Sequence, residues 1–349
     1  MRKNRSRTRT AGLAFAVLGL LGASGFLTLA MQDRHPDPGG VASTALGQQS
    51  QQQASYRYER LTKPSRTVVR DAHGSIVATL TDTARTAVLI GPSRSFAEPR
   101  TTDATVTSDS WVRLMPRKWS KGSENRAWFR AWFKKNQGST APDILEMAMQ
   151  YGDGARAKRN AQGLRYAGDA QFGPLNPNGS KHNDERLESS DFYDYLGIAW
   201  KFRDGTLQHA SRKHHESVDC SGFIRLLYGY RAGYPLNGSD HSRTDGLPRT
   251  ANAMARQGPG VPVIPLDGER PASIGTLQPG DLVFFELDAR TGATLDHSAI
   301  YLGLDTEGHP RFISSREEAN GPTIGDLGGT SRLDGDGYYA KALRGAKRL

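Results

Sequence analysis

Only one cysteine, Cys220, occurs in the 349 residues of this chain. A disulfide within the chain and a cysteine-rich zinc site are therefore excluded, so the fold must rest on hydrophobic cores. The hydrophobic fraction of 36% is enough for such cores, and the length gives room for two domains at roughly 100 to 200 residues each. The one thiol is then either a packing residue or a nucleophile.

The first 31 residues read as an export signal. Five Lys and Arg residues stand in the first ten positions without an acidic residue, and positions 11–31 carry no charge. The uncharged run is close to the roughly 20 residues that a helix needs to cross a bilayer, so a cleaved signal peptide and a retained membrane anchor both remain open. The leading positive charges predict that everything from Gln32 onward lies outside the cytoplasm. We expect a secreted protein or one anchored at the membrane, facing the cell wall.

The net charge of the chain indicates which kinds of partner it could bind. The formal net charge is +10, and removal of the five leading positive residues leaves +5 for the exported part. This excess suits attraction to an anionic wall polymer or membrane surface, although solubility alone explains it equally well. The histidines at 209, 214 and 215 lack the spacing of a zinc motif. We predict no metal, no cofactor and no nucleic-acid partner.

Composition divides the rest of the chain. Residues 32–55 are rich in Gly, Ser, Ala and Gln and read as a flexible linker. Short alternating runs at 67–70 and 75–80, separated by a turn, predict a β-hairpin, and 86–90 predicts another strand. We expect a small β-rich module over residues 56–140.

An aromatic and basic segment, SENRAWFRAWFKK, occupies residues 123–135 and predicts a helix that begins after Ser123. Such a helix either packs its Trp residues into a core between domains, which is the commoner case, or grips a polymer or membrane surface. Gly138–Pro142 then breaks the chain. We place the main domain at 141–349.

The chemistry centres on the segment VDCSGFIRLL around Cys220. Apolar residues after Ser221 recur at helical spacing, so Cys220 lies at the N-terminus of a helix. Unpaired amides and the positive end of the helix dipole stabilise a thiolate there, and the thiolate is the species that attacks carbonyl groups. The neighbouring Asp219 is poor material for a core. These features favour a nucleophile.

A thiolate needs an imidazole partner, and His297 is the best placed of nine histidines. A Pro-Gly turn at 279–280 precedes the apolar strand 282–287, and a second strand begins at His297. The period of two puts His297 and Tyr301 on one face of that second strand. A histidine that opens a strand can face a helix N-terminus.

Four blocks of this sequence, in this order, resemble the NlpC/P60 family of peptidases: DCSGF at 219–223, LPRT at 247–250, LQPGDLVFF at 277–285 and DHSAIYLG at 296–303. The resemblance covers residues 190–345. It implies an α+β, papain-like fold in which the helix with the nucleophile packs on an antiparallel sheet, preceded here by the β-rich module. It also implies hydrolysis of bacterial peptidoglycan peptides, commonly between γ-D-glutamyl and diaminopimelyl residues, with Cys220 as nucleophile and His297 as general base.

Family members carry a third polar residue, usually histidine, on the strand after the catalytic histidine. The matching position here is Ser314, whose hydroxyl can accept a hydrogen bond from the ring and fix its tautomer. The family's tyrosine upstream of the nucleophile has no clean counterpart, and Tyr195 and Trp200 are its candidates.

The proposed site is completed by three further residues. The helix-terminal amides near Ser221 would stabilise the oxyanion, and Asp219 and Tyr301 are candidates for the substrate cleft. Three functions remain open from the sequence: a wall-remodelling cysteine peptidase, a related thiol amidase or acyltransferase, and an inactive wall-binding module with an unactivated Cys220.

Overall fold

The structure is a computed structural model that describes residues 56–180, 185–241 and 244–349. The predicted export signal at 1–31 and the linker at 32–55 lie outside the described residues. Every described residue belongs to one compact unit of the chain, Gln53–Leu349. Across the three described ranges, none of the helices has both the length and the apolarity to cross a membrane.

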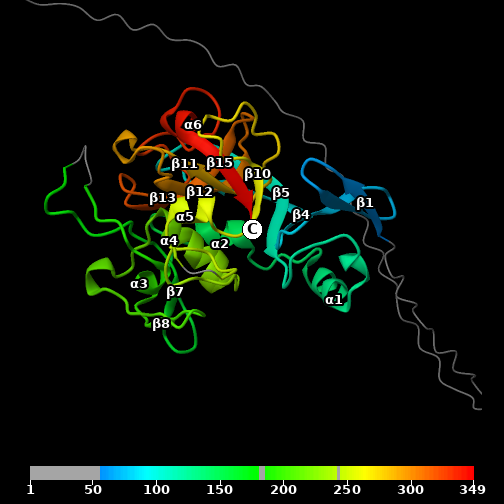
Figure 1. Ribbon diagram of the computed structural model, residues 1–349, viewed down its shortest axis with the longest axis horizontal. Coiled ribbons are helices and arrows are strands. Elements are labelled where there is room, and N and C mark those ends of the chain that lie inside the picture. Colours follow the sequence, from blue (N-terminus) through cyan, green and yellow to red (C-terminus); the bar gives the residue numbers. More distant parts are fainter. Residues whose placement is uncertain (1–55, 181–184, 242–243) are drawn as a thin grey trace, which may run out of the picture. The chain divides into compact units, whose positions relative to one another are not determined.

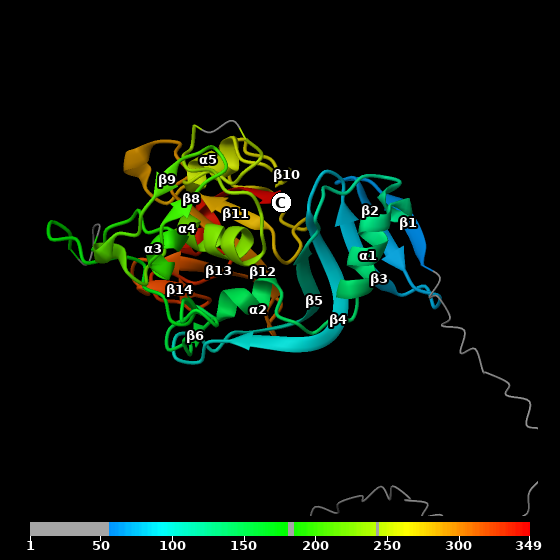
Figure 2. The same ribbon diagram turned by 90° about the horizontal axis from the view of Figure 1, so that it is seen from below.

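An antiparallel sheet of five strands, paired in chain order, opens the described chain (Figures 1 and 2). Its strands are β1 (Arg57–Leu61), β2 (Arg66–Arg70), β3 (Ile76–Thr81), β4 (Thr86–Ala97) and β5 (Thr105–Leu114). The predicted hairpin is present as β2 and β3, with Thr67 opposite Leu80. Asp71 closes the turn because its carboxylate accepts the amide hydrogens of His73 and Ser75, each at 2.9 Å.

One face of this sheet is covered by helix α1 (Ala127–Asn136) (Figure 2). Phe129 and Phe133 are four residues apart, so they share one side of the helix, and both are buried. Phe129 also packs against Trp119, with ring centroids 4.7 Å apart. Trp128 and Trp132 are half-buried at the rim of the same core. The aromatic segment therefore packs as expected, but mainly through its phenylalanines, and into the core of this sheet.

A second antiparallel sheet holds six strands in the order β10-β15-β11-β12-β13-β14. Their bounds are β10 (Val261–Ile264), β11 (Leu282–Phe285), β12 (His297–Leu304), β13 (Pro310–Arg316), β14 (Gly321–Thr323) and β15 (Leu343–Arg348). Alternate residues of these strands face two different apolar clusters. The architecture is α+β, because helices gather against an antiparallel sheet.

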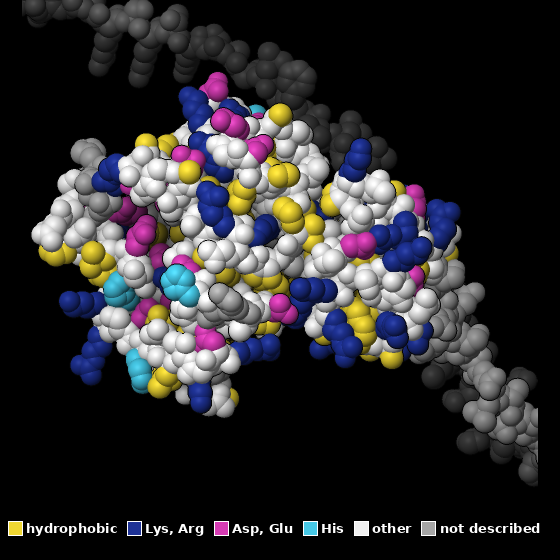
Figure 3. Space-filling model, viewed as in Figure 1, with side chains coloured by type: hydrophobic (Ala, Val, Ile, Leu, Met, Phe, Trp, Pro, Cys, Tyr) yellow, Lys and Arg dark blue, Asp and Glu magenta, His cyan; other side chains and the backbone are white. Residues whose placement is uncertain are grey.

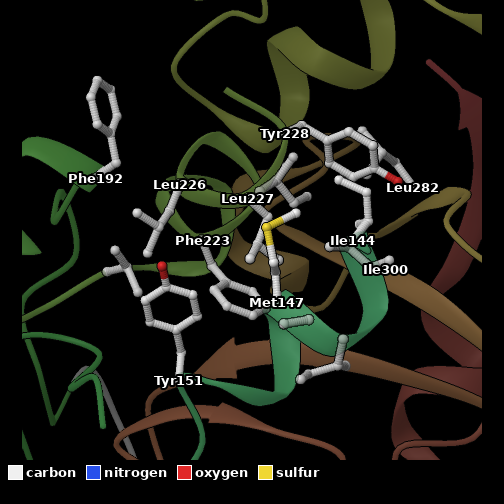
Figure 4. Packing of buried hydrophobic residues seen from close by; sticks show 14 of the residues in the cluster. Ile144, Met147, Tyr151, Phe192, Phe223, Leu226, Leu227, Tyr228, Leu282 and Ile300 are labelled. Atoms are coloured by element: carbon white, nitrogen blue, oxygen red, sulfur yellow. The ribbon is translucent and has the colours of Figure 1, made fainter. Parts of the chain in front are cut away.

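The larger apolar cluster lies between this sheet and three helical segments (Figure 4). These are α2 (Ile144–Met149), α4 (Cys220–Ile224) and the π-helical turn η3 (Arg225–Arg231) that continues α4. Phe223 of α4 packs edge-on against Tyr151, which follows α2, with ring centroids 6.1 Å apart. The apolar spacing after Cys220 thus buries one side of α4 against the sheet.

The remaining elements are short. They are η1 (Ser123–Asn125), β6 (Lys158–Arg159), β7 (Arg165–Ala167), α3 (Phe192–Leu196), β8 (Trp200–Lys201), β9 (Leu207–Gln208), η2 (Arg212–His214), α5 (Ala251–Arg256), η4 (Ala289–Thr291) and α6 (Tyr338–Ala342). Of these, α6 covers the smaller apolar cluster through Tyr339. The division of the chain into domains between residues 140 and 141 stays a prediction. The two sides of this boundary are in contact, because the amide of Val112 in β5 donates to the Asp143 carboxylate at 2.6 Å.

Candidate active site

Cys220 is the first residue of α4, and Asp219 is its N-cap. The Asp219 carboxylate accepts the amide hydrogen of Gly222 at 2.7 Å, which satisfies one of the unpaired donors of the first turn. Gly222 lets α4 pack closely against the backbone at Ser190, because a Cβ at this position would stand 2.2 Å from the carbonyl oxygen of Ser190. The segment DCSG therefore fits both the cap and the packing of the helix.

The thiol points toward the start of β12. Its Sγ donates a long hydrogen bond, 3.8 Å, to the carbonyl oxygen of Asp296, the residue that immediately precedes His297. Cys220 is 6% exposed and His297 is 7% exposed. The structure thus brings the two predicted catalytic residues into one buried neighbourhood.

His297 forms part of the wall of a cavity of about 640 Å³. Its ring lies against Phe285 and Tyr339, with centroid distances of 5.8 and 5.6 Å. Its Nε2 atom is buried without a hydrogen-bonding partner. The other lining residues are Phe172, Ser180, Glu185, Glu188, Leu287, Asp288, Arg290, Thr291, Asp296, Arg316, Glu317, Glu318, Tyr338 and Tyr339. Six of them are carboxylates, so the cavity is acidic.

Both candidate catalytic groups are neutral in this conformation. Burial, with help from the nearby carboxylates of Asp219 and Glu188, raises the pKa of the Cys220 thiol far above its usual range. Burial and the positive charge of Arg316 lower the pKa of His297 to about 3. The expectation that a helix N-terminus yields a thiolate is therefore not met here, because loss of solvation disfavours the anion more than the helix dipole favours it.

Asp219 is held by a residue that sequence reasoning did not single out as functional. Arg249, from the LPRT block, pairs with the Asp219 carboxylate at 2.5 Å and donates to the Ser221 hydroxyl at 2.7 Å. Its own pKa is raised because the carboxylates of Asp219 and Asp191 outweigh the cost of burial. The structure places Asp219 and Ser221 in this ion-paired cap, outside the lining of the cavity.

Ser314 is fully buried on β13, and its hydroxyl accepts a hydrogen bond from Nε of Arg316 at 3.1 Å. Ile313 of β13 pairs with Ile300 of β12, and the positive charge of Arg316, further along β13, acts on the His297 ring. Arg316 is a cation and cannot accept a hydrogen bond from the ring. Sequence reasoning missed Arg316, although its spacing of two from Ser314 puts both on one face.

The remaining candidates lie away from the cavity lining. Tyr301 is buried in the smaller apolar cluster, and burial raises its pKa to about 12. Tyr195 donates through its hydroxyl to the carbonyl of Gly168 at 2.8 Å, and Trp200 packs on Phe192. His214 bonds Ser190 at 2.7 Å. In the part of the chain that the structure describes, no group of three or more His, Cys, Asp or Glu residues is arranged to hold a metal ion.

The influence of Arg316 on His297 can be measured. Arg316→Gln removes a positive charge beside the ring, so we expect the pKa of His297 to rise from about 3 toward its ordinary range. Histidine ring-proton shifts in an NMR titration report this change. Arg344→Gln, at a cation of β15 paired with Glu286, is the matched control and leaves the His297 titration in place. If the titration curve of His297 is unchanged in Arg316→Gln, Arg316 does not lower the pKa of the ring.

Part of the chain is similar to known proteins. The family model described as NlpC/P60 matches residues 202–341. A solved structure described as similar to lipoprotein, NLP/P60 family, from Staphylococcus aureus shares 26% sequence identity, with a TM-score of 0.24; the match covers 45% of this chain and 38% of that one. No curated protein matches the chain.

Residues 202–341 therefore resemble the NlpC/P60 family. Proteins of this family are generally cysteine peptidases that act on peptides of the cell wall. The matched region contains Cys220, His297 and Arg249 together with the strands and helices that position them.

Proposed function

We propose that this chain is an exported cysteine peptidase that hydrolyses peptide bonds in peptidoglycan stem peptides. The observation that carries the proposal is the placement of Cys220, at the first position of α4, against the residue that precedes His297 in a region matched by the NlpC/P60 model. Helix α4 on the antiparallel sheet supports a papain-like arrangement, with the five-stranded sheet as a preceding module. The predicted export signal supports a site of action at the cell wall.

The roles of the residues follow from acyl-transfer chemistry. His297 takes the thiol proton as Cys220 attacks the peptide carbonyl and forms a carbon–sulfur bond. Asp219 already occupies the amide of Gly222, which leaves the amide of Ser221 to stabilise the oxyanion. The C–N bond then breaks as His297 returns the proton to the leaving amine. Water, deprotonated by His297, hydrolyses the thioester and regenerates the thiol.

This sequence of steps requires the site to open from the conformation described. The thiol now contacts a backbone carbonyl, and Nε2 of His297 has no partner. Movement of the Asp296 carbonyl away from the sulfur would free the thiol to meet the ring. Ser314, bonded to Arg316, would reach His297 as a third catalytic residue only after a similar rearrangement.

The charge of the cavity bears on the substrate. Carboxylates of Glu188, Asp296 and Glu318 are among the six that line it. Such a lining favours a ligand that carries an amino group, because opposite charges attract and like charges repel. A stem peptide with a free amine on its diamino acid fits that requirement.

Digestion of defined muropeptides tests the proposed activity directly. We expect the native protein to convert a soluble stem peptide into two fragments whose summed mass exceeds that of the substrate by one water. Mass spectrometry of the products identifies the bond that was cut. Protein alkylated at Cys220 under denaturing conditions and then refolded is the control, and equal hydrolysis by both samples contradicts a thiol mechanism.

An inactive wall-binding module is the second candidate, and the buried, protonated thiol favours it. We expect iodoacetamide to alkylate Cys220 at least about tenfold more slowly at pH 8 in the folded protein than in the unfolded chain, because thiolate is the reactive form and the folded state disfavours it. The folded-state rate should then rise only at higher pH. Intact-mass analysis gives both rates. A folded-state rate that is high and constant between pH 6 and 8 contradicts the resting state described.

The two candidates make different predictions in the presence of substrate. A peptidase cleaves muropeptides despite slow alkylation at rest, because substrate binding opens the site. An inactive module leaves every muropeptide intact. The digestion experiment therefore decides between them.

A further inference from the structure

Positive charge is concentrated in the first part of the described chain. Residues 56–140 contain 16 Lys and Arg against 7 Asp and Glu, whereas residues 141–349 contain 24 against 27. The matched NlpC/P60 region therefore does not account for the basic character of the protein. Dark-blue side chains crowd the part of the surface formed by the five-stranded sheet and α1 (Figures 1 and 3).

The strongest concentration lies in residues 117–135, which we call the basic segment. It holds seven cations and a single acid, Glu124. All seven cations are exposed, and no ion pair within the described chain involves them. They are Arg117, Lys118, Lys121, Arg126, Arg130, Lys134 and Lys135.

Three of these cations form a ridge along α1. Arg126, Arg130 and Lys134 are spaced by four residues, so they project from one side of the helix at steps of about 6 Å. Phe129 and Phe133, three residues after Arg126 and Arg130, lie on the adjacent side of the helix and fix it to the sheet. The ridge is therefore a linear row of positive charges on a rigid support.

Stability of the helix does not explain this ridge. Arg126 is the N-cap of α1 and makes no capping hydrogen bond with its side chain, and cations at this end oppose the helix dipole. Like charges four residues apart also repel each other. Lys134 lies in the last turn, where a cation favours the dipole, but neither this effect nor capping accounts for the row as a whole.

The geometry points to a linear phosphodiester polymer of the cell surface as the ligand of the basic segment. Such a polymer presents one negative charge per repeat, and a row of Arg and Lys side chains can follow it. A bilayer is a poorer match, because the large apolar side chains that stand exposed in the described chain lie outside residues 117–135. Binding would hold the enzyme on the wall without occupying the acidic cavity, and it does not depend on the proposed peptidase activity.

A triple variant tests this assignment in the full chain. Arg126→Ala, Arg130→Ala and Lys134→Ala together remove the ridge, and alanine favours the helix while the repulsion disappears, so the variant should fold at least as well as the native protein. The matched control is Lys201→Ala, Arg203→Ala and Lys213→Ala, at three exposed cations in or directly before the family region that also lack ion pairs in the described chain. Both variants lose three positive charges.

The probe is purified polyglycerol phosphate, with anionic phosphatidylglycerol vesicles as the second arm. We expect affinity for the polymer at low salt to fall roughly 10- to 100-fold in the ridge variant and less than about threefold in the control variant. Hydrolysis of a soluble stem peptide should be unchanged. Equal losses in both variants would show attraction by net charge alone, and tighter binding to vesicles would show a membrane site. Either result overturns the proposal.

Discussion

Replacement of Cys220 by alanine is expected to reduce the release of peptides from purified peptidoglycan by roughly 10³-fold or more, because the acyl-enzyme cannot form without the sulfur. His297→Ala should cause a loss of similar order, since these residues act as a unit and their effects do not add. Mass analysis of released muropeptides measures both. Continued release of the same muropeptides by Cys220→Ala would show that the nucleophile lies elsewhere.

The control for this experiment is His309→Ala. His309 is half-buried and bonds Asp334 at 2.8 Å, outside the lining of the cavity. Its removal costs a similar volume of side chain, and we expect activity within about twofold of the native value because a partly exposed pair contributes little. If His309→Ala lost as much activity as His297→Ala, the losses would reflect damage to the fold rather than removal of a catalytic group.

Arg225→Met is expected to lower the free energy of unfolding by about 3–5 kcal/mol, because it leaves the buried Asp191 carboxylate with only the longer ion pair to Arg249, at 3.6 Å, and removes the donor to three backbone carbonyls. The Arg225 guanidinium is fully buried and donates through Nε to both carboxylate oxygens of Asp191 at 3.0 Å. Its Nη1 also donates to the backbone carbonyls of Asn237, Leu247 and Pro248. Denaturant unfolding followed by circular dichroism gives the change.

Arg100→Met provides the comparison. Arg100 pairs with Asp153 on the surface, where both side chains are more than half exposed. An exposed pair is worth about 0–1 kcal/mol because water and salt screen it. Similar destabilisation by the two substitutions would contradict the expectation that the buried contacts of Arg225 stabilise the protein more than an exposed ion pair does.

Much of the fold could be predicted from local patterns. The hairpin of β2 and β3 has alternating apolar residues around an Asp turn, and the strand that begins at His297 has the same period of two. Cys220 could be placed at the start of a helix because the apolar residues after it recur at helical spacing. Each of these signals lies within about ten residues of sequence.

The electrostatics of the site could not be predicted in this way. The neutral state of Cys220 depends on burial by segments far along the chain and on the carboxylates of Asp219 and Glu188. The effect of Arg316 on His297 depends on how β12 and β13 pair. The resemblance predicts Ser314 as the third catalytic residue, but its hydrogen bond goes to Arg316. Such distant contacts leave no periodic signal in the sequence.

The last strand, β15, and the residue that follows it, Leu349, connect the two sheets through hydrogen bonds. Backbone amides of Arg85 and Thr86, at the start of β4, donate to the carbonyl of Leu349 at 2.7 and 2.5 Å. The buried Arg348 bridges Thr81 of β3 and Asp281 before β11. Because these hydrogen bonds connect the two sheets, neither sheet can unfold without disturbing the other. We therefore expect heat to unfold both in a single calorimetric transition. If the two sheets were produced as separate fragments, each fragment would expose to water the hydrogen-bonding groups that now pair with the other sheet.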